Sequence, residues 1–275
     1  MTKIKSILES VENIKKEIGE DRVHIFPLMG QSNMVGGGGQ DPIEREINGR
    51  ILYLDLENKL QVVEGNLYSE NSLYNYGYIL GIQCPECYSL GIKFADEMIK
   101  QYGENDIIVL VPCARGMSTI NEQIDHCAVT AFGLRPPLPL YDFCKERVDI
   151  LLNGCKNASV DAVLYYQGES DCGNPDNWKK RMIELIGKVE KDFPNAVFMY
   201  AQLAGNGQWT EEQIKKWNDF KIMQCVLAIE NNLNMVYLGD LPLIDGIHLT
   251  TRGLEIAGWK FSKMYKGISN DNSIQ

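Results

Sequence analysis

Ser32 and His248 are the residues of this chain whose types and surroundings best suit nucleophilic chemistry. Ser32 follows a short apolar run, within Gly-Gln-Ser-Asn-Met, and a serine hydroxyl becomes a strong nucleophile only beside a general base. The chain has three histidines, and of these His24 falls inside an apolar run, where a structural role is expected. Ser32 is thus a candidate nucleophile with His248 as candidate base, and a serine that only caps a turn is the open alternative.

Asp245 precedes His248 by three residues on what should be one loop. This spacing lets a carboxylate reach the imidazole Nδ1 and fix the tautomer and orientation of the ring. His126 adjoins Asp125 but has no acid at a comparable spacing. His248 is therefore the best base that the chain offers, with Asp245 placed to orient it.

A second polar cluster, Gln167, Glu169 and Asp171, follows another apolar run. Gln167 can supply an N–H donor to a developing oxyanion. The two carboxylates can bind a metal ion, act as acid and base, or cap and brace neighbouring backbone, and for Asp171 we favour the last role. A metal site would need further ligands, so we expect no metal and no cofactor.

Two short motifs resemble ligand sites but lack residues that such sites need. The four glycines at 36–39 have no following Lys-Ser/Thr, as a phosphate-binding loop requires, and are interpreted as flexible backbone beside the site. Cys84 and Cys87 have metal-like or redox-like spacing, but no second such pair and no nearby histidine pair. We interpret the two cysteines as structural.

The elements that must position these residues alternate between apolar runs and helical patterns. Short, nearly continuous apolar runs are typical of parallel strands covered on both faces. The five predicted strands are Val23–Met29, Ile107–Pro112, Ala162–Tyr166, Val197–Gln202 and Met235–Leu238. The predicted helices are Leu90–Gln101, Tyr141–Leu152, Trp178–Asp192, Glu211–Glu230 and Arg252–Tyr265. This alternation predicts a three-layer α/β domain whose strands meet ligands at their carboxyl ends.

Outside this pattern, the chain divides into a leading helix, one domain and a tail. Residues 1–22 have apolar positions at helical spacing and predict an amphipathic helix. Residues 23–266 form the predicted domain, with a small hairpin of Ile51–Leu56 and Leu60–Val63 and a long loop at Ala114–Pro139. Residues 267–275 are predicted to be a frayed tail.

Four segments together resemble the SGNH-hydrolase superfamily. They are Gly-Gln-Ser-Asn-Met at 30–34, Val-Pro-Cys-Ala-Arg-Gly at 111–116, Gln-Gly-Glu-Ser-Asp at 167–171 and Asp-Gly-Ile-His-Leu-Thr at 245–250. More narrowly, they are similar to its sialate O-acetylesterase and acetylxylan esterase branch, carbohydrate esterase family six. The resemblance runs in order from about residue 23 to residue 265.

The resemblance implies a flavodoxin-like fold with a central five-stranded parallel sheet and a serine–histidine–aspartate site. By that resemblance Ser32, His248 and Asp245 match the catalytic residues, and Gln167 matches the side-chain donor to the oxyanion. The backbone N–H of Ser32 should also donate. Ser89 stands where the family has a glycine whose N–H is the remaining donor, so the chain departs from the pattern there. Gln31, Asn33 and Glu169 complete the expected oxyanion and substrate-binding set.

Composition narrows the function further. A net charge of −10 and a pI of about 4.9 disfavour nucleic acid as a partner, since phosphate binding needs a basic face. No signal peptide and no apolar stretch long enough for a membrane span are visible. With eight cysteines interpreted as reduced thiols, this predicts a cytoplasmic protein without a membrane partner.

We therefore expect a serine esterase that removes O-acetyl groups from a small acetylated carbohydrate, of the xylo-oligosaccharide or sialic acid type. The alternatives are an esterase or thioesterase acting on another small acyl substrate, and a catalytically idle carbohydrate-binding protein. The sequence leaves open which sugar is bound and what the oligomeric state is.

Overall fold

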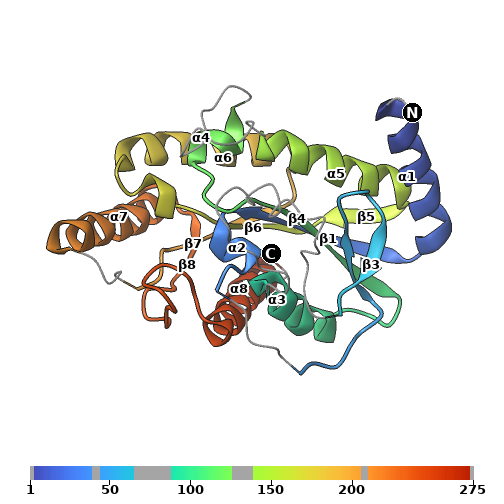
Figure 1. Cartoon of the computed structure of the whole chain (residues 1–275). Coiled ribbons are helices and arrows are strands. Elements are labelled where there is room, and N and C mark those ends of the chain that lie inside the picture. Colours follow the sequence, from blue (N-terminus) through green and yellow to red (C-terminus); the bar gives the residue numbers. More distant parts are fainter. Residues whose placement is uncertain (1–2, 39–43, 65–87, 126–138, 206–209, 273–275) are drawn as a thin grey trace.

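The computed structural model describes residues 3–38, 44–64, 88–125, 139–205 and 210–272. In these residues eight strands form one sheet, in the order β3-β2-β4-β1-β6-β7-β8, with β5 also paired to β1 (Figure 1). The strands are β1 (Arg22–Gly30), β2 (Ile51–Leu54), β3 (Leu60–Val62), β4 (Asp106–Ala114), β5 (Asn157–Val160), β6 (Ala162–Tyr166), β7 (Val197–Ala201) and β8 (Asn234–Val236). The five predicted strands are thereby confirmed as the adjacent parallel set β4-β1-β6-β7-β8.

The sheet has more strands than the predicted five, because the hairpin β2–β3 and the strand β5 also belong to it. The predicted hairpin of β2 and β3 is antiparallel, and β2 also pairs in parallel with β4, so the hairpin extends the main sheet. The unpredicted β5 pairs with the first half of β1 and β6 with its last residues, and Asp161 separates the two. The polar composition of β5, in which only Val160 is buried, explains why no apolar run marks it.

Helices cover both faces of the sheet, as expected when parallel strands are joined by crossovers. They are α1 (Lys3–Ile18), α2 (Ser32–Val35), α3 (Leu90–Met98), α4 (Ile120–Ile124), α5 (Leu140–Gly154), α6 (Pro175–Asp192), α7 (Glu211–Glu230) and α8 (Thr251–Asn272). Helices α3 and α8 pack together below the sheet in Figure 1, and α4, α5 and α6 lie above it. Capping boxes begin α4 at Thr119 and α7 at Thr210, which explains their sharp starts.

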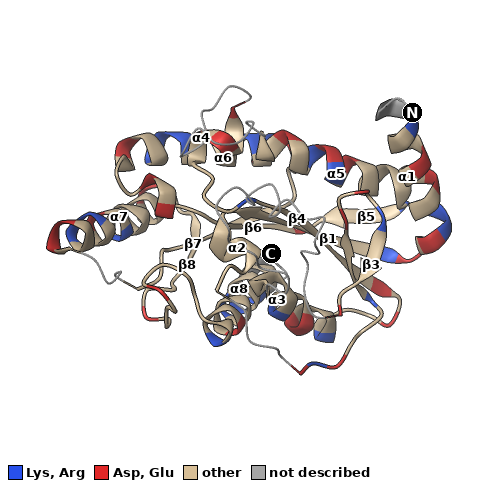
Figure 2. Ribbon diagram, in the orientation of Figure 1, with Lys and Arg blue, Asp and Glu red and all other residues tan. Residues whose placement is uncertain are grey.

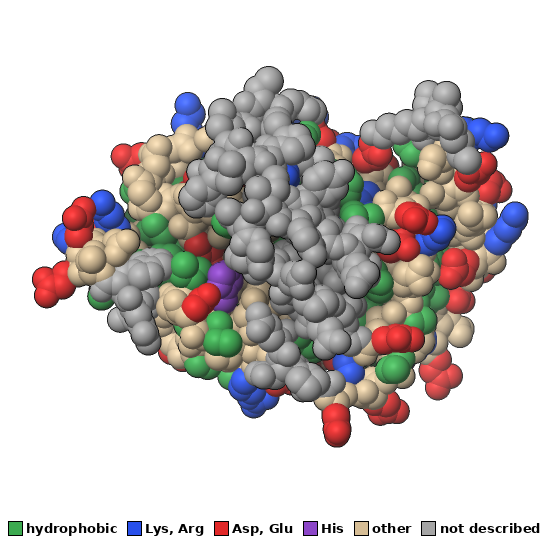
Figure 3. Space-filling view, viewed as in Figure 1, with side chains coloured by type: hydrophobic (Ala, Val, Ile, Leu, Met, Phe, Trp, Pro, Cys, Tyr) green, Lys and Arg blue, Asp and Glu red, His purple; other side chains and the backbone are tan. Residues whose placement is uncertain are grey.

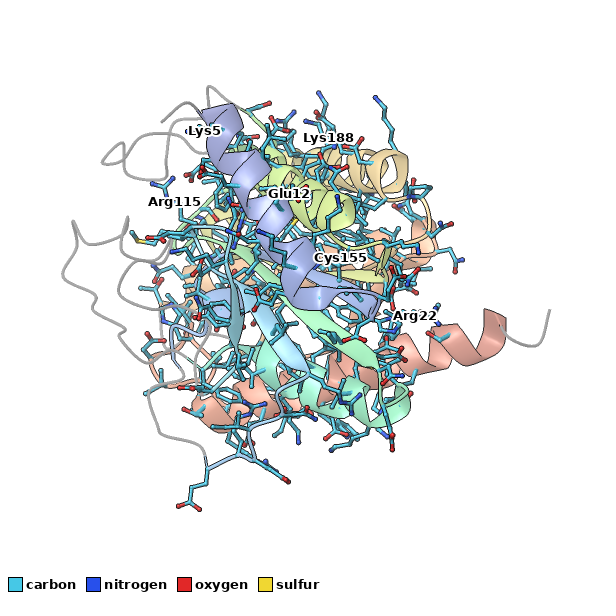
Figure 4. All side chains as sticks on the ribbon, turned by 90° about the vertical axis from the view of Figure 1, so that its right-hand side faces the viewer. Lys5, Glu12, Arg22, Arg115, Cys155 and Lys188 are labelled. Carbon is cyan, nitrogen blue, oxygen red and sulfur yellow. The ribbon has the colours of Figure 1, made fainter. Side chains whose placement is uncertain are left out.

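The first and last elements of the described chain are helices that pack on the domain. Helix α1 lies against α5 (Figure 4), and Ile14 and Ile18 belong to the same buried core as the strands. Gly154 of α5 makes this approach possible, because a Cβ there would lie 2.8 Å from the Ile14 side chain. Helix α8 continues to Asn272, so the tail predicted from residue 267 is helical that far, and residues 273–275 lie outside the described residues. The last turns of α8 are mostly polar, so no apolar periodicity in the sequence predicts them as helix.

Charged side chains of both signs are interspersed along the outer helices (Figure 2). Among the described residues, no helix combines the length and apolarity needed to cross a membrane. Cys84, Cys87 and Cys127 lie outside the described residues, and the five other cysteines are free thiols.

Strand register determines where the site forms. Gly30, the last residue of β1, is aligned with Ala114 of β4 and with Tyr166 of β6. The segments that follow these three strands therefore leave the sheet side by side at its carboxyl edge. Figure 4 labels Arg22, at the start of β1, and Arg115, just after β4, at opposite ends of the molecule.

Candidate active site

A tight turn after β1 presents Ser32 at the carboxyl edge of the sheet. Gly30 has a φ of +138°, and a Cβ at this position would lie 2.1 Å from the carbonyl oxygen of Tyr166. The next residue, Gln31, donates its backbone N–H to the same carbonyl at 3.0 Å and stands at the N-cap of α2. Ser32 is thus the first residue of a helix held firmly against β6.

The structure joins the three predicted catalytic residues in one hydrogen-bonded path. Ser32 Oγ lies 3.0 Å from His248 Nε2, and His248 Nδ1 lies 2.6 Å from Asp245 Oδ2. In the neutral imidazole, Nδ1–H donates to the carboxylate, which leaves Nε2 to accept the serine proton. The geometry is that of a nucleophile, a base and an orienting acid.

Asp245 holds the loop of His248 as well as its ring. Its Oδ1 accepts the backbone N–H groups of Ile247 at 3.0 Å and of His248 at 2.8 Å. Partial burial raises the pKa of Asp245, but these bonds and the one from the His248 ring outweigh it and leave the pKa below its ordinary value. The Asp245 side chain is 51% exposed and that of His248 is 23% exposed. Histidine is visible at the surface in Figure 3.

Gln167 does not fit its expected role as donor to the oxyanion. It is fully buried, and its Nε2 already donates to Gln31 Oε1, to Asp171 Oδ2 and to the carbonyl of Ser118. The amide orientation is unambiguous, because the indole N–H of Trp178 must meet an acceptor and lies 2.8 Å from Gln167 Oε1. An amide nitrogen has only two protons, so this one has none left for a substrate.

Gln31 is oriented in the opposite sense. Its Oε1 accepts from Gln167 Nε2 at 3.1 Å and lies within 3.4 Å of the N–H groups of Gly168 and Ser170. These donors fix the oxygen toward the 167–170 segment, so the Gln31 Nε2 must point elsewhere. Among the described residues this nitrogen has no hydrogen-bond acceptor.

Ser89 braces the site from behind with its hydroxyl. The Ser89 Oγ donates to the carbonyl of Met34 at 2.9 Å and accepts the N–H of Gly91 as the N-cap of α3. The side chain is fully buried, so it ties α2 to α3 and does not narrow the pocket as a free side chain would. Its backbone N–H as an oxyanion donor stays a prediction.

Glu169 Oε1 and Asp171 Oδ2 accept hydrogen bonds from protein groups, whereas Glu169 Oε2 is buried without a hydrogen-bond partner among the described residues. Burial raises the pKa of Glu169, although Asn33 donates to its Oε1 at 2.6 Å. Burial also raises the pKa of Asp171 to about 6, and its Oδ2 accepts the N–H of Ile120, the first residue of α4. Asp171 thus braces backbone as predicted, but the cap of α6 is Asn174. No cluster of three or more metal-ligand side chains occurs within the described ranges.

The glycines after Ser32 are packed against the catalytic loop, which corrects their interpretation as flexible backbone. A Cβ at Gly38 would lie 2.1 Å from the carbonyl oxygen of Leu249, and one at Gly37 would lie 3.3 Å from the His248 ring. Glycine is needed here because the two segments approach within backbone contact. Residue 39 lies outside the described residues.

Ser118 is a site residue that sequence reasoning missed. Its Oγ donates to the carbonyl of Gly30 at 3.1 Å and accepts from Gln123 Nε2 at 2.9 Å, while the backbone N–H of Arg115 also reaches Gly30. These bonds hold the turn before Ser32 from the β4 side. Ser118 lies in the predicted loop of 114–139, where no periodic pattern marks it, and residues 126–138 of that loop are outside the described residues.

Comparison with known proteins shows the family of the chain. Residues 22–266 match the protein family described as carbohydrate esterase, sialic acid-specific acetylesterase. A probable carbohydrate esterase of Arabidopsis thaliana is 27% identical over 266 residues, which are 88% of this chain and 89% of that protein.

Solved structures share the fold. An Arabidopsis thaliana protein has a TM-score of 0.68 at 24% identity, over 90% of this chain and 98% of that one. NanS has a TM-score of 0.69 at 13% identity, over 92% and 99%. A carbohydrate acetylesterase from Xanthomonas citri has a TM-score of 0.55 at 14% identity, over 88% of this chain and 55% of that one. The three-layer α/β architecture is therefore that of known esterases.

Proposed function

The chain belongs to the family of carbohydrate esterases described as sialic acid-specific acetylesterases, and we propose that it removes O-acetyl groups from a carbohydrate through an acyl-enzyme on Ser32. One observation carries the proposal: the unbroken path from Ser32 Oγ through the His248 ring to Asp245, at 3.0 and 2.6 Å. A serine in this arrangement is deprotonated as it attacks, which is the requirement for ester chemistry.

The reaction proceeds in two balanced halves. Ser32 Oγ attacks the acetyl carbonyl carbon while His248 Nε2 takes the serine proton, and the carbonyl π electrons move to its oxygen. When the tetrahedral intermediate collapses, the sugar oxygen leaves with the proton from His248 and the acetyl group stays on Ser32. Water then attacks the acetyl-serine, with His248 as base, and acetate and free Ser32 are released.

Charge on the oxyanion needs donors, and we assign them to the start of α2. The Ser32 backbone N–H follows directly on the N-cap, and Gln31 Nε2 points away from the acceptors that surround Gln167. This replaces Gln167, whose protons are in use, by Gln31 as the side-chain donor. Removal of one such donor lowers kcat by about 10²–10³ in other hydrolases.

The substrate we propose is a small acetylated sugar or oligosaccharide. Family membership supports the acetyl group and the carbohydrate, and the Xanthomonas citri neighbour is itself called a carbohydrate acetylesterase. We further propose that the protein works in a reducing, cytoplasmic compartment, which its five free thiols in the described segments support.

Mass spectrometry of acetylated sugars incubated with the enzyme tests the proposal. We expect loss of acetyl from O-acetylated xylo-oligosaccharides or O-acetylated sialic acids, and no loss with the Ser32→Ala variant. A p-nitrophenyl ester series should show rates that fall from acetate to octanoate. Rates that rise with chain length, or equal activity of Ser32→Ala, would refute the proposed substrate or nucleophile respectively.

A further inference from the structure

Asn33 is a fully buried amide that contacts the loop of His248 on both sides of the histidine. Its Nδ2 donates to the carbonyl of Ile247 at 3.0 Å, and its Oδ1 accepts the N–H of Leu249 at 2.9 Å. The second Nδ2 proton goes to Glu169 Oε1 at 2.6 Å. Both protons of the nitrogen are thus used, and the oxygen is held as well.

We infer that Asn33 is a positioning residue that sets the distance between the nucleophile and its base, an inference that rests on the proposed esterase function. Asn33 follows Ser32 within α2, so the segment that carries Ser32 Oγ also carries the amide that grips the neighbours of His248. Any shift of the loop relative to α2 has to break these bonds. The Asn33 amide therefore fixes the His248 loop relative to α2, and with it the 3.0 Å distance between Ser32 Oγ and His248 Nε2.

Among the described residues, and apart from the Ser32–His248 contact itself, the other hydrogen bonds of the loop do not hold it in place relative to α2. Asp245 binds the ring of His248 and the N–H groups of Ile247 and His248, and the Ile244 N–H donates to the carbonyl of His248 at 2.8 Å. All of these lie within the loop and hold His248 to Asp245, not to Ser32. With the Asp245 side chain half exposed, the loop is a surface turn that needs an anchor to the interior.

Only a side-chain amide of this length can make the anchor. Ile247 offers an acceptor and Leu249 a donor, so the bridging group must have both functions. Glu169 holds the amide in one orientation, because rotation would set Asn33 Oδ1 against the Glu169 carboxylate and Nδ2 against the N–H of Leu249. An aspartate lacks the donors, and an aliphatic side chain lacks both functions.

Two variants separate lost bonds from lost volume. Asn33→Ala removes the three bonds and leaves space, while Asn33→Leu removes the bonds and fills the space. We expect both to lower kcat on p-nitrophenyl acetate by about 10²-fold with KM changed by less than about threefold, since misplacing a catalytic group by an ångström costs about this much. Asn234→Ala is the matched control, because Asn234 Nδ2 also donates to a backbone carbonyl, that of Phe198, at 3.2 Å, and should leave kcat within about twofold.

Long-range 1H–15N correlation spectra of the histidine rings distinguish a local release of His248 from a general loss of structure. His24 Nδ1 lies 2.6 Å from Asp161 in the buried core and serves as the internal reference for a folded protein. In the Asn33 variants the His248 ring nitrogens should move toward the averaged values of a mobile imidazole, while the His24 signals stay in place. His248→Ala assigns the signals.

Three results would overturn the inference: wild-type kcat in both Asn33 variants, a lower kcat with unchanged His248 ring signals, or a rise in KM alone. A variant that loses the His24 signals is unfolded, and the other Asn33 variant then tests the inference. If the wild-type enzyme hydrolyses no ester, the proposed function fails, but the ring signals still show whether Asn33 holds His248.

Discussion

The side-chain amides of Gln31 and Gln167 are hydrogen-bonded to each other, and we propose that the first serves catalysis and the second stability. Substituting them one at a time should separate the two effects. Gln31→Glu keeps an oxygen for Gln167 Nε2 but replaces the nitrogen that points away from it. We expect kcat to fall by about 10²–10³, equivalent to about 2.7–4 kcal/mol of transition-state stabilisation, with KM changed little. Thermal stability should stay near that of the wild type, because the internal acceptor is preserved.

Gln167→Ala should act mainly on folding. It leaves the Trp178 indole N–H and the Ser118 carbonyl without a buried partner, whereas Asp171 Oδ2 keeps the bond from the Ile120 N–H. At about 1–3 kcal/mol for each of these two unsatisfied groups, about 2–6 kcal/mol of the unfolding free energy should be lost. For a domain stabilised by about 5–15 kcal/mol this is a large fraction.

Urea denaturation, together with kcat and KM on p-nitrophenyl acetate, measures both effects. The folded fraction of Gln167→Ala should have a kcat within about tenfold of the wild-type value, because Gln167 donates no proton to the oxyanion. Full stability of Gln167→Ala combined with a large loss of kcat, and normal turnover of Gln31→Glu, would show that the amide assignments derived from Trp178 are wrong.

Three further predictions follow from the site. Because burial raises the pKa of Asp171 from 3.8 to about 6, the folded protein binds this proton more tightly than the unfolded chain. The unfolding free energy of the wild type should therefore gain about 2 kcal/mol relative to that of Asp171→Asn as the pH falls from about 6 to 4, and a gain with rising pH would contradict this sign. Asp245→Asn should lower kcat by at least about 10²-fold and more than Glu169→Gln does, because of these two carboxylates Asp245 is the one hydrogen-bonded to the His248 ring; the reverse order in steady-state kinetics would exchange their roles. Gly38→Ala should lower kcat without unfolding the protein, since its methyl group would push against the Leu249 carbonyl beside His248; unchanged kcat would show that the loop yields freely.

Much of the fold was predictable because the central strands are apolar on both faces. Buried parallel strands leave continuous apolar runs, and β6 and α7 were predicted with the bounds that the structure has. What escaped prediction carries weak local signals. Strand β5 has one buried residue, and α4 is a single short turn inside a long loop whose start depends on its Thr119 capping box.

The proposed catalytic residues were predictable for a different reason, which is that histidine is scarce in this chain. Of the three histidines in the chain, His24 and His248 each follow an aspartate by three residues, but His24 lies inside an apolar run, so few choices remained. The direction of a side-chain amide cannot be inferred in this way. The role of Gln167 depends on Trp178 and on Ser118, which is 49 residues away, and that of Asn33 on main-chain groups 214 and 216 residues away.

Covalent trapping of the nucleophile tests the central claim most directly. The intact enzyme would be treated with a fluorophosphonate, digested, and the modified residue located by tandem mass spectrometry, with His248→Ala as the control. The structure predicts one adduct, on Ser32, that forms in parallel with loss of esterase activity and far more slowly in His248→Ala. An adduct on another residue, or full esterase activity in protein whose Ser32 is modified, would contradict the assignment of Ser32 as the nucleophile.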